Sequence, residues 1–390
     1  MKPSEAGRTD LGRLGRRPTP AGTAGGKRGS SAGTRPELPA ARARELKPLL
    51  DALRVRASVE RRVEEDPVSL VRAYGRAEDQ EVAGLFCASL AYGRVDLFKP
   101  ILARLLRSLG PSPSDFCRDL RERRDFTPFV GLVYRFNLGA DLACLAWAIG
   151  EAQRTFGSLE GLFLAELART GDLKTALAGF TEWLRGRDFQ VVKSALGPPR
   201  ALAHLLPDAR RGGASKRLLL YLRWMARGPD EVDLGAWRGL SPRQLIIPVD
   251  THVSRMSRNL GLTRRRDLSW RTAEEITASL RLVDPNDPVS YDFALCHFGM
   301  SGACPARRVA VRCARCELFS ACQPGQRLVR LKTAQGERTV RSAPRSAAGK
   351  STPRAVARVR AKVSNGSGPS ITRPRGSLPG IRARSGTDRS

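Results

Sequence analysis

Four cysteines near the C-terminal end of the chain carry the clearest chemical pattern. Cys304, Cys313, Cys316 and Cys322 follow the spacing C-x8-C-x2-C-x5-C. Two thiolates separated by two residues can bind one metal centre from a single tight turn, and two further cysteines complete a four-sulfur shell. In a reducing compartment such a cluster indicates a metal site rather than disulfides. The spacing by itself fits either a [4Fe–4S] cluster or tetrahedral zinc.

A second pattern ends in a single carboxylate. The apolar run Leu245-Ile-Ile-Pro-Val leads directly to Asp250, and a helix is predicted to begin at Thr251 and His252. An aspartate in this position is first of all an N-cap, whose side chain accepts hydrogen bonds from the free N–H groups of the first helical turn. Taken alone, the pattern therefore predicts a capping role for Asp250.

The elements that position these residues are predicted to be helical over residues 45–322. Segments such as VAGLFCASLAYG, FKPILARLLRSLG and LKTALAGFTEWLRG place apolar residues at intervals of three and four. No segment shows sustained apolar–polar alternation, so the sequence predicts an all-α core. Cys87, Cys117 and Cys144 lie apart from the cluster, and we expect them to be small core residues.

Charge separates this core from the two ends of the chain. The formal net charge is +30, of which residues 1–44 contribute +7 and residues 323–390 contribute +14. Both ends are rich in Arg, Gly, Ser and Pro and almost free of aromatics, so we predict two disordered basic arms. Such arms suit a polyanion such as DNA, although charge alone also fits RNA, anionic lipid or polyphosphate.

The chain shows neither a run of about eighteen apolar residues nor an apolar secretory segment, which predicts a cytoplasmic protein without a membrane span.

Several stretches resemble one enzyme superfamily. VDTHVSRMSRNLGL is similar to the Asp motif of endonuclease III in the helix-hairpin-helix DNA glycosylase superfamily. FALCHFGMSGACP and the cysteine cluster resemble that family's C-terminal iron–sulfur region, in the same order. DPVSLVRAYGRAEDQEVAGLFCASLAYG and SKRLLLYLRWMARG resemble a bacterial branch of the superfamily. The resemblance covers nearly all of 45–322 and implies a two-subdomain helical glycosylase-type fold with a [4Fe–4S] cluster.

The chain departs from the endonuclease III pattern in two places. The first cysteine gap is eight residues rather than six, and no L-P-G-V-G hairpin with a following catalytic lysine precedes Asp250. Lys216 lies 34 residues before Asp250 instead, a separation that resembles the archaeal 8-oxoguanine glycosylases. The resemblance thus implies Lys216 as a Schiff-base nucleophile and Asp250 as the stabilising, proton-transferring carboxylate; the alternative for Lys216 is a surface lysine that contacts phosphate.

The resemblance also implies contact with double-stranded DNA by a monomer associated with the nucleoid. By helical spacing, Lys216, Arg223 and Arg227 share one face, which we expect to meet DNA. The predicted DNA-contacting residues are Gly213, Arg217, Arg223, Arg255 and Arg308. An ordinary loop is the alternative for Gly212-Gly213, and we expect His252 and His297 to be structural and Trp224 and Trp237 to be core residues.

The predicted function is base-excision repair by a DNA glycosylase, with possible strand cleavage by an AP-lyase step. Two alternatives stay open: a non-catalytic DNA- or RNA-binding protein on the same scaffold, and a zinc-stabilised basic adaptor.

Overall fold

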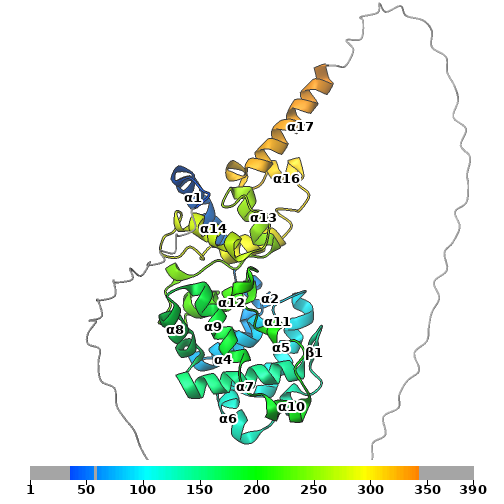
Figure 1. Ribbon diagram of the computed structural model, residues 1–390. Helices are drawn as coiled ribbons and strands as arrows, with labels where there is room; N and C mark the ends of the chain where they lie inside the picture. The colour runs from blue at the N-terminus through cyan, green and yellow to red at the C-terminus, as the bar shows by residue number, and fades with distance from the viewer. Residues whose placement is uncertain (1–35, 57–58, 342–390) are drawn as a thin grey trace, which may run out of the picture. The chain divides into compact units, whose positions relative to one another are not determined.

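The computed structural model of the protein describes residues 36–56 and 59–341. This part of the chain is all-α, as the periodicity predicts, with one two-stranded hairpin (Figure 1). The first helices are α1 (Ala40–Arg56), α2 (Val59–Glu65), α3 (Val68–Arg72), α4 (Ala77–Leu90), α5 (Val95–Leu109) and α6 (Pro113–Arg123). After the short helix η1 (Thr127–Phe129), the antiparallel strands β1 (Val133–Tyr134) and β2 (Asn137–Leu138) follow.

The remaining elements complete the described chain. They are α7 (Gly139–Phe156), α8 (Leu159–Thr170), α9 (Leu173–Arg185), α10 (Gln190–Leu196), α11 (Leu202–Leu205), η2 (Ala209–Arg211), α12 (Lys216–Ala226), η3 (Pro242–Gln244), α13 (Thr251–Leu260), α14 (Trp270–Arg281), α15 (Asp292–Met300), α16 (Ala310–Ala314), η4 (Phe319–Ala321) and α17 (Gln323–Arg341). No described helix combines the length and the apolarity that a membrane crossing requires.

Helix α7 forms the centre of one group of helices. Its sequence is apolar on all sides and rich in Ala and Gly, which is typical of a helix surrounded by others, and it packs against α6, α8, α9, α10 and α11. The small residues permit close approach, because a Cβ added at Gly139 would lie 1.8 Å from the Phe129 carbonyl oxygen. At Gly150 it would lie 2.0 Å from that of Cys117. The expected core positions Cys87, Cys117, Cys144, Trp224 and Trp237 are all buried.

A second group of helices joins the N-terminal helix to the region around the Asp motif. Helix α15 packs against both α13 and α1 (Figure 1). The Leu38 N–H donates to the Ser279 hydroxyl of α14 at 3.4 Å, and that hydroxyl in turn donates to the Leu262 carbonyl at 2.8 Å. Residues far apart in sequence therefore build the surroundings of α13.

Buried charges connect α12 to α15. The Arg223 side chain of α12 is 4% exposed and forms ion pairs with Asp233, at 3.1 Å, and with Asp292 at the start of α15. One turn later, Arg227 contacts Asp233 at 2.7 Å and Asp287 at 2.8 Å. Burial opposes the charged form of Arg223, but Asp233 and Asp292 outweigh it and raise its pKa. A buried cation with two buried anions is tolerated only because each neutralises the other.

The basic arms begin farther from the core than the composition predicts. Helix α1 starts at Ala40, and Leu38 is 3% exposed, so the predicted boundary at residue 44 is wrong. At the other end, residues 323–341 form α17, and the prediction of disorder is wrong for this segment. Composition misses α17 because it averages a helical stretch with the Gly- and Pro-rich sequence after it. The rest of both arms, 1–35 and 342–390, lies outside the described residues.

Removing the Arg223 charge should destabilise the protein strongly. We expect Arg223→Met to lower the free energy of unfolding by about 3–5 kcal/mol in urea denaturation, because Asp233 and Asp292 would remain buried with less compensation. Adding Asp292→Asn should recover part of that loss. Arg104→Met, at an exposed position of α5, is the control and should change stability by less than about 0.5 kcal/mol. A loss at Arg223 no larger than at Arg104 would contradict the role of the buried pairs.

Candidate active site

Lys216 and Asp250 meet in the folded protein. Lys216 is the first residue of α12 and Asp250 is the N-cap of α13, and the Lys216 Nζ lies 3.9 Å from the Asp250 Oδ2. Their side chains are 34% and 22% exposed, so both keep access to solvent. The structure thus brings together the two residues that the resemblance implies as a catalytic pair.

The two oxygens of Asp250 have different environments. Oδ1 accepts hydrogen bonds from the backbone N–H groups of His252 and Val253, each at 2.8 Å, which is the capping arrangement expected at this position. Oδ2 faces Lys216 and accepts from the Cys296 thiol at 3.4 Å. Capping therefore fixes the carboxylate while one oxygen stays directed towards the amine.

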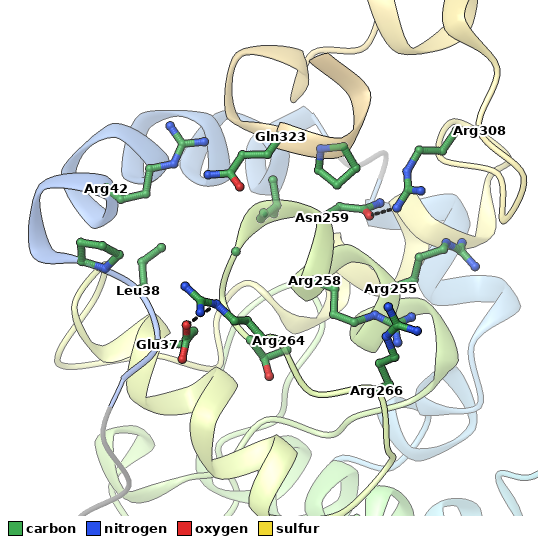
Figure 2. Close-up of a pocket in the computed structure, with 15 residues that line it drawn as sticks. Glu37, Leu38, Arg42, Arg255, Arg258, Asn259, Arg264, Arg266, Arg308 and Gln323 are labelled. Carbon is green, nitrogen blue, oxygen red and sulfur yellow. Dashed lines mark hydrogen bonds and ion pairs between the residues drawn. The ribbon is translucent and has the colours of Figure 1, made fainter. Parts of the chain in front are cut away.

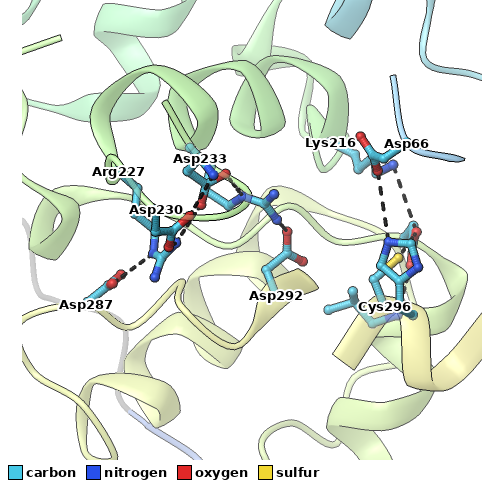
Figure 3. Close-up of polar contacts among 12 residues, drawn as sticks. Asp66, Lys216, Arg227, Asp230, Asp233, Asp287, Asp292 and Cys296 are labelled. Atoms are coloured by element: carbon cyan, nitrogen blue, oxygen red, sulfur yellow. Dashed lines mark hydrogen bonds and ion pairs between the residues drawn. The ribbon is translucent and has the colours of Figure 1, made fainter. Parts of the chain in front are cut away.

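A cavity of about 890 Å³ opens in front of this pair. Its volume is in the range of small-molecule sites. The walls come from segments that are distant in the sequence, and Figure 3 shows Asp66, Lys216 and Cys296 converging from three of them. The charged or titratable residues that line the cavity are Arg62, Glu65, Asp66, Arg94, Asp96, Lys216, Asp250, His252, Cys296 and His297.

Burial keeps two of these residues uncharged. The pKa of His297 is lowered to about 4 by burial and by the neighbouring Arg62 and Arg223 cations, so the imidazole is neutral at pH 7. Its Nε2 lies 4.0 Å from Asp66 Oδ2. Burial, together with Asp250 and Asp292, raises the pKa of Cys296 well above its usual value, so the thiol keeps its proton and acts as a donor to Asp250.

One of the predicted DNA contacts is wrong, and a second has its guanidinium occupied by protein groups. Arg223 is 3% exposed and held between carboxylates, so it does not lie on a DNA-facing surface. Arg217 donates both terminal nitrogens to the backbone carbonyls of Ser89 and His204, and it lies over the Tyr92 ring at 5.1 Å. Helical periodicity predicted one basic face for Lys216, Arg223 and Arg227, but it could not show that carboxylates from other segments surround Arg223 and Arg227.

The other three predicted contacts remain accessible at the surface. Gly213 is exposed and pairs in an isolated bridge with Ser269, which gives its loop a fixed shape. Arg255 donates to the Gly299 carbonyl at 2.7 Å, and the exposed Arg308 donates to the Asn259 side chain at 2.6 Å. Both arginines line one pocket (Figure 2).

The four cysteines of the 304–322 segment are near neighbours. The Cys316 N–H donates to the Cys313 carbonyl at 3.1 Å, which forms the tight turn that the C-x2-C spacing predicts. Burial and the nearby Cys304 and Cys322 thiols raise the pKa of Cys316, and burial with Cys304 and Cys313 raises that of Cys322. A Cβ at Gly325 would lie 3.1 Å from the Cys322 sulfur, so glycine leaves room beside the thiols.

These thiols fit the chemistry of a four-sulfur ligand set. In the part of the chain that the structure describes, however, no group of three or more His, Cys, Asp or Glu side chains is arranged closely enough to hold a metal ion. The metal site therefore stays a prediction.

Sequence reasoning missed Asp66 and Cys296 as parts of the cavity. Asp66 precedes Pro67 in a turn and carries no motif, and Cys296 was one thiol within FALCHFG. Only the fold brings these segments to Lys216.

The arrangement defines an all-α protein with a lysine–aspartate pair at the wall of a cavity of about 890 Å³. A family model described as "Protein of unknown function (DUF2400)" matches residues 66–301, and the chain belongs to this family. No curated protein and no solved structure matches the chain. The matched segment includes Asp66, Lys216, Asp250 and Cys296 and ends before Cys304.

The neutral state of His297 should make stability depend on pH. Because its pKa in the folded protein, about 4, lies below the usual 6.5, the unfolded chain binds the proton more readily between these values. The stability that neutral His297 contributes is therefore complete above pH 6.5 and is lost as pH falls towards 4. Relative to His297→Gln, wild type should lose up to about 3 kcal/mol of unfolding free energy across this window in denaturation measurements. Parallel pH profiles of the two proteins would contradict this burial of the imidazole.

Proposed function

We propose that the protein is a DNA base-excision glycosylase with an associated AP-lyase step. The observation that carries the proposal is the approach of the Lys216 amine to the Asp250 carboxylate, 3.9 Å apart at the wall of a cavity large enough for an extruded nucleoside. An amine and a carboxylate placed in this way supply a nucleophile and a group that transfers its proton.

In the proposed reaction, the Lys216 amine attacks C1′ of the target nucleotide. The C1′–N bond to the base breaks, and its electron pair leaves with the base, which is then protonated. Asp250 stabilises positive charge on the sugar and accepts a proton from the attacking nitrogen. The C1′–O4′ bond then breaks, O4′ takes the proton held by Asp250, and an iminium ion forms between the lysine and C1′. Loss of a C2′ proton then expels the 3′ phosphate and cleaves the strand.

The surroundings support this assignment of roles. One Asp250 oxygen is fixed by two backbone N–H groups, so the carboxylate needs little reorganisation when charge develops on the sugar. The Cys296 thiol holds the other oxygen near Lys216. Arg62 and Arg94 line the cavity and can meet phosphates beside an extruded nucleotide.

We further propose that the two groups of helices correspond to the two subdomains of a glycosylase-type fold. In this arrangement α12 contributes the lysine from one subdomain and α13 the aspartate from the other. The protein would then act as a monomer on double-stranded DNA in the nucleoid, in keeping with its net charge of +30.

Covalent trapping tests the proposal. Wild type, Lys216→Ala and Asp250→Asn would be incubated with duplexes carrying oxidised, alkylated or deaminated bases, together with borohydride. We expect a protein–DNA adduct with wild type that Lys216→Ala loses, and base release about 10²–10⁴ times slower in Asp250→Asn. Asparagine is also a good N-cap, so α13 should remain folded.

Lys193→Ala provides the matched control, because Lys193 is an exposed helix lysine outside the cavity lining. It should form the adduct as wild type does. An adduct that persists in Lys216→Ala would contradict the assignment of the nucleophile. If the protein binds the duplex tightly but forms no adduct and releases no base from any lesion, the enzyme proposal is contradicted. That result would support the alternative of a non-catalytic nucleic-acid-binding protein.

We also propose that Cys304, Cys313, Cys316 and Cys322 bind a [4Fe–4S] cluster, which would hold the 304–322 segment in shape. Protein purified without oxygen should be brown and contain about four iron atoms per chain. Cys313→Ser should lose the colour, whereas Cys87→Ala, a change in the core, should keep it. A colourless protein with one bound zinc would contradict the cluster and support the zinc alternative.

A further inference from the structure

A second pocket, separate from the cavity at Lys216, is lined by arginines. It encloses about 650 Å³ and is built from the N-terminal segment with α1, from α13 and the loop after it, and from the cysteine segment with the start of α17 (Figure 2). Six arginines line it, at positions 42, 255, 258, 264, 266 and 308, and Glu37 is the one acidic residue in the lining.

Several of these arginines already have partners. Arg264 pairs with Glu37 at 2.5 Å, Arg42 donates to the Ala321 carbonyl at 2.6 Å, and Arg308 donates to Asn259 at 2.6 Å. Asn259 in turn donates to the Cys304 sulfur at 3.3 Å, which connects the pocket wall to the cysteine segment. Among the described residues, Arg258 and Arg266 pair with no carboxylate.

This surplus of positive charge favours an anion. Like charges held in a concave site repel one another, and a concave low-dielectric wall focuses their field into the pocket. Arg255 also carries an unsatisfied hydrogen-bond donor, because its Nε is buried without a hydrogen-bond partner among the described residues. A tetrahedral oxyanion offers several acceptors at once and matches the paired donors of a guanidinium.

We propose that this pocket binds a phosphate group through Arg258 and Arg266, with Arg255 at its wall. Two sources share this chemistry: a phosphate of the DNA backbone, or a free phosphate compound. Arg258 lies eight residues after Asp250 along α13, a rise of about 12 Å, which is within reach of a strand that enters the cavity. The phosphate site itself does not depend on catalysis by Lys216; only its assignment to the DNA backbone rests on the proposed function.

Inorganic pyrophosphate is the probe. Its dissociation constant would be measured by calorimetry on the full chain, with ionic strength matched by chloride. We expect Arg258→Gln/Arg266→Gln to weaken binding at least tenfold. The control, Arg104→Gln/Arg107→Gln, removes the same charge from exposed positions of α5 and should leave binding unchanged. All variants retain the other basic side chains, so a difference in pyrophosphate affinity between the two double variants is due to the pocket arginines.

Competition between pyrophosphate and a DNA duplex identifies which source of phosphate the pocket binds. If the pocket holds backbone phosphate, pyrophosphate should displace the duplex, and the double variant should reduce the slope of log affinity against log salt by about one to two. If it holds a free phosphate compound, the double variant should lose pyrophosphate and bind the duplex normally. Equal pyrophosphate affinity in all three proteins, or none at millimolar concentration, would overturn the proposal. Because the pyrophosphate measurement needs no lesion and no adduct, its failure is distinguishable from failure of the glycosylase assignment.

Discussion

The buried contact of Arg223 with Asp233 and Asp292 holds the rest of the site in place. Arg223 lies two turns after Lys216 on α12, and Asp292 is the first residue of α15, four residues before Cys296. The same ion pairs that join the two groups of helices therefore fix the start of α12 relative to the thiol that contacts Asp250. Because buried charges tolerate little separation, this contact sets the Lys216–Asp250 geometry more tightly than apolar packing would.

The site uses its charges in two distinct ways. Deep in the protein, Arg223 and Arg227 are neutralised by carboxylates and contribute to structure. Nearer the surface, Lys216 and Asp250 keep partial exposure, and the buried residues beside them, His297 and Cys296, stay uncharged. The cavity thus presents the Lys216 amine and one Asp250 oxygen beside two uncharged side chains, with further charged residues of both signs elsewhere in its lining.

The sequence predicted the secondary-structure elements well, but it predicted the tertiary contacts of individual side chains less well. Helical periodicity predicted an all-α core, and the capping pattern placed Asp250 at the start of α13, because both depend on residues close in the chain. Arg223 was wrongly assigned to a DNA-facing surface, since a carboxylate that binds it, Asp292, comes from a distant segment. Asp66 and Cys296 reach the site only through tertiary packing. Helix α17 was not predicted, because the composition of residues 323–390 is dominated by the segment that follows the helix.

The central claim is that α12 and α13 place one lysine and one aspartate at the same reaction centre. The most direct test is to digest the borohydride-trapped protein–DNA adduct and locate the modified residue by mass spectrometry. We predict that the sugar remnant is attached to Lys216, at the start of α12. Attachment to another lysine, or to the N-terminal amine, would contradict it.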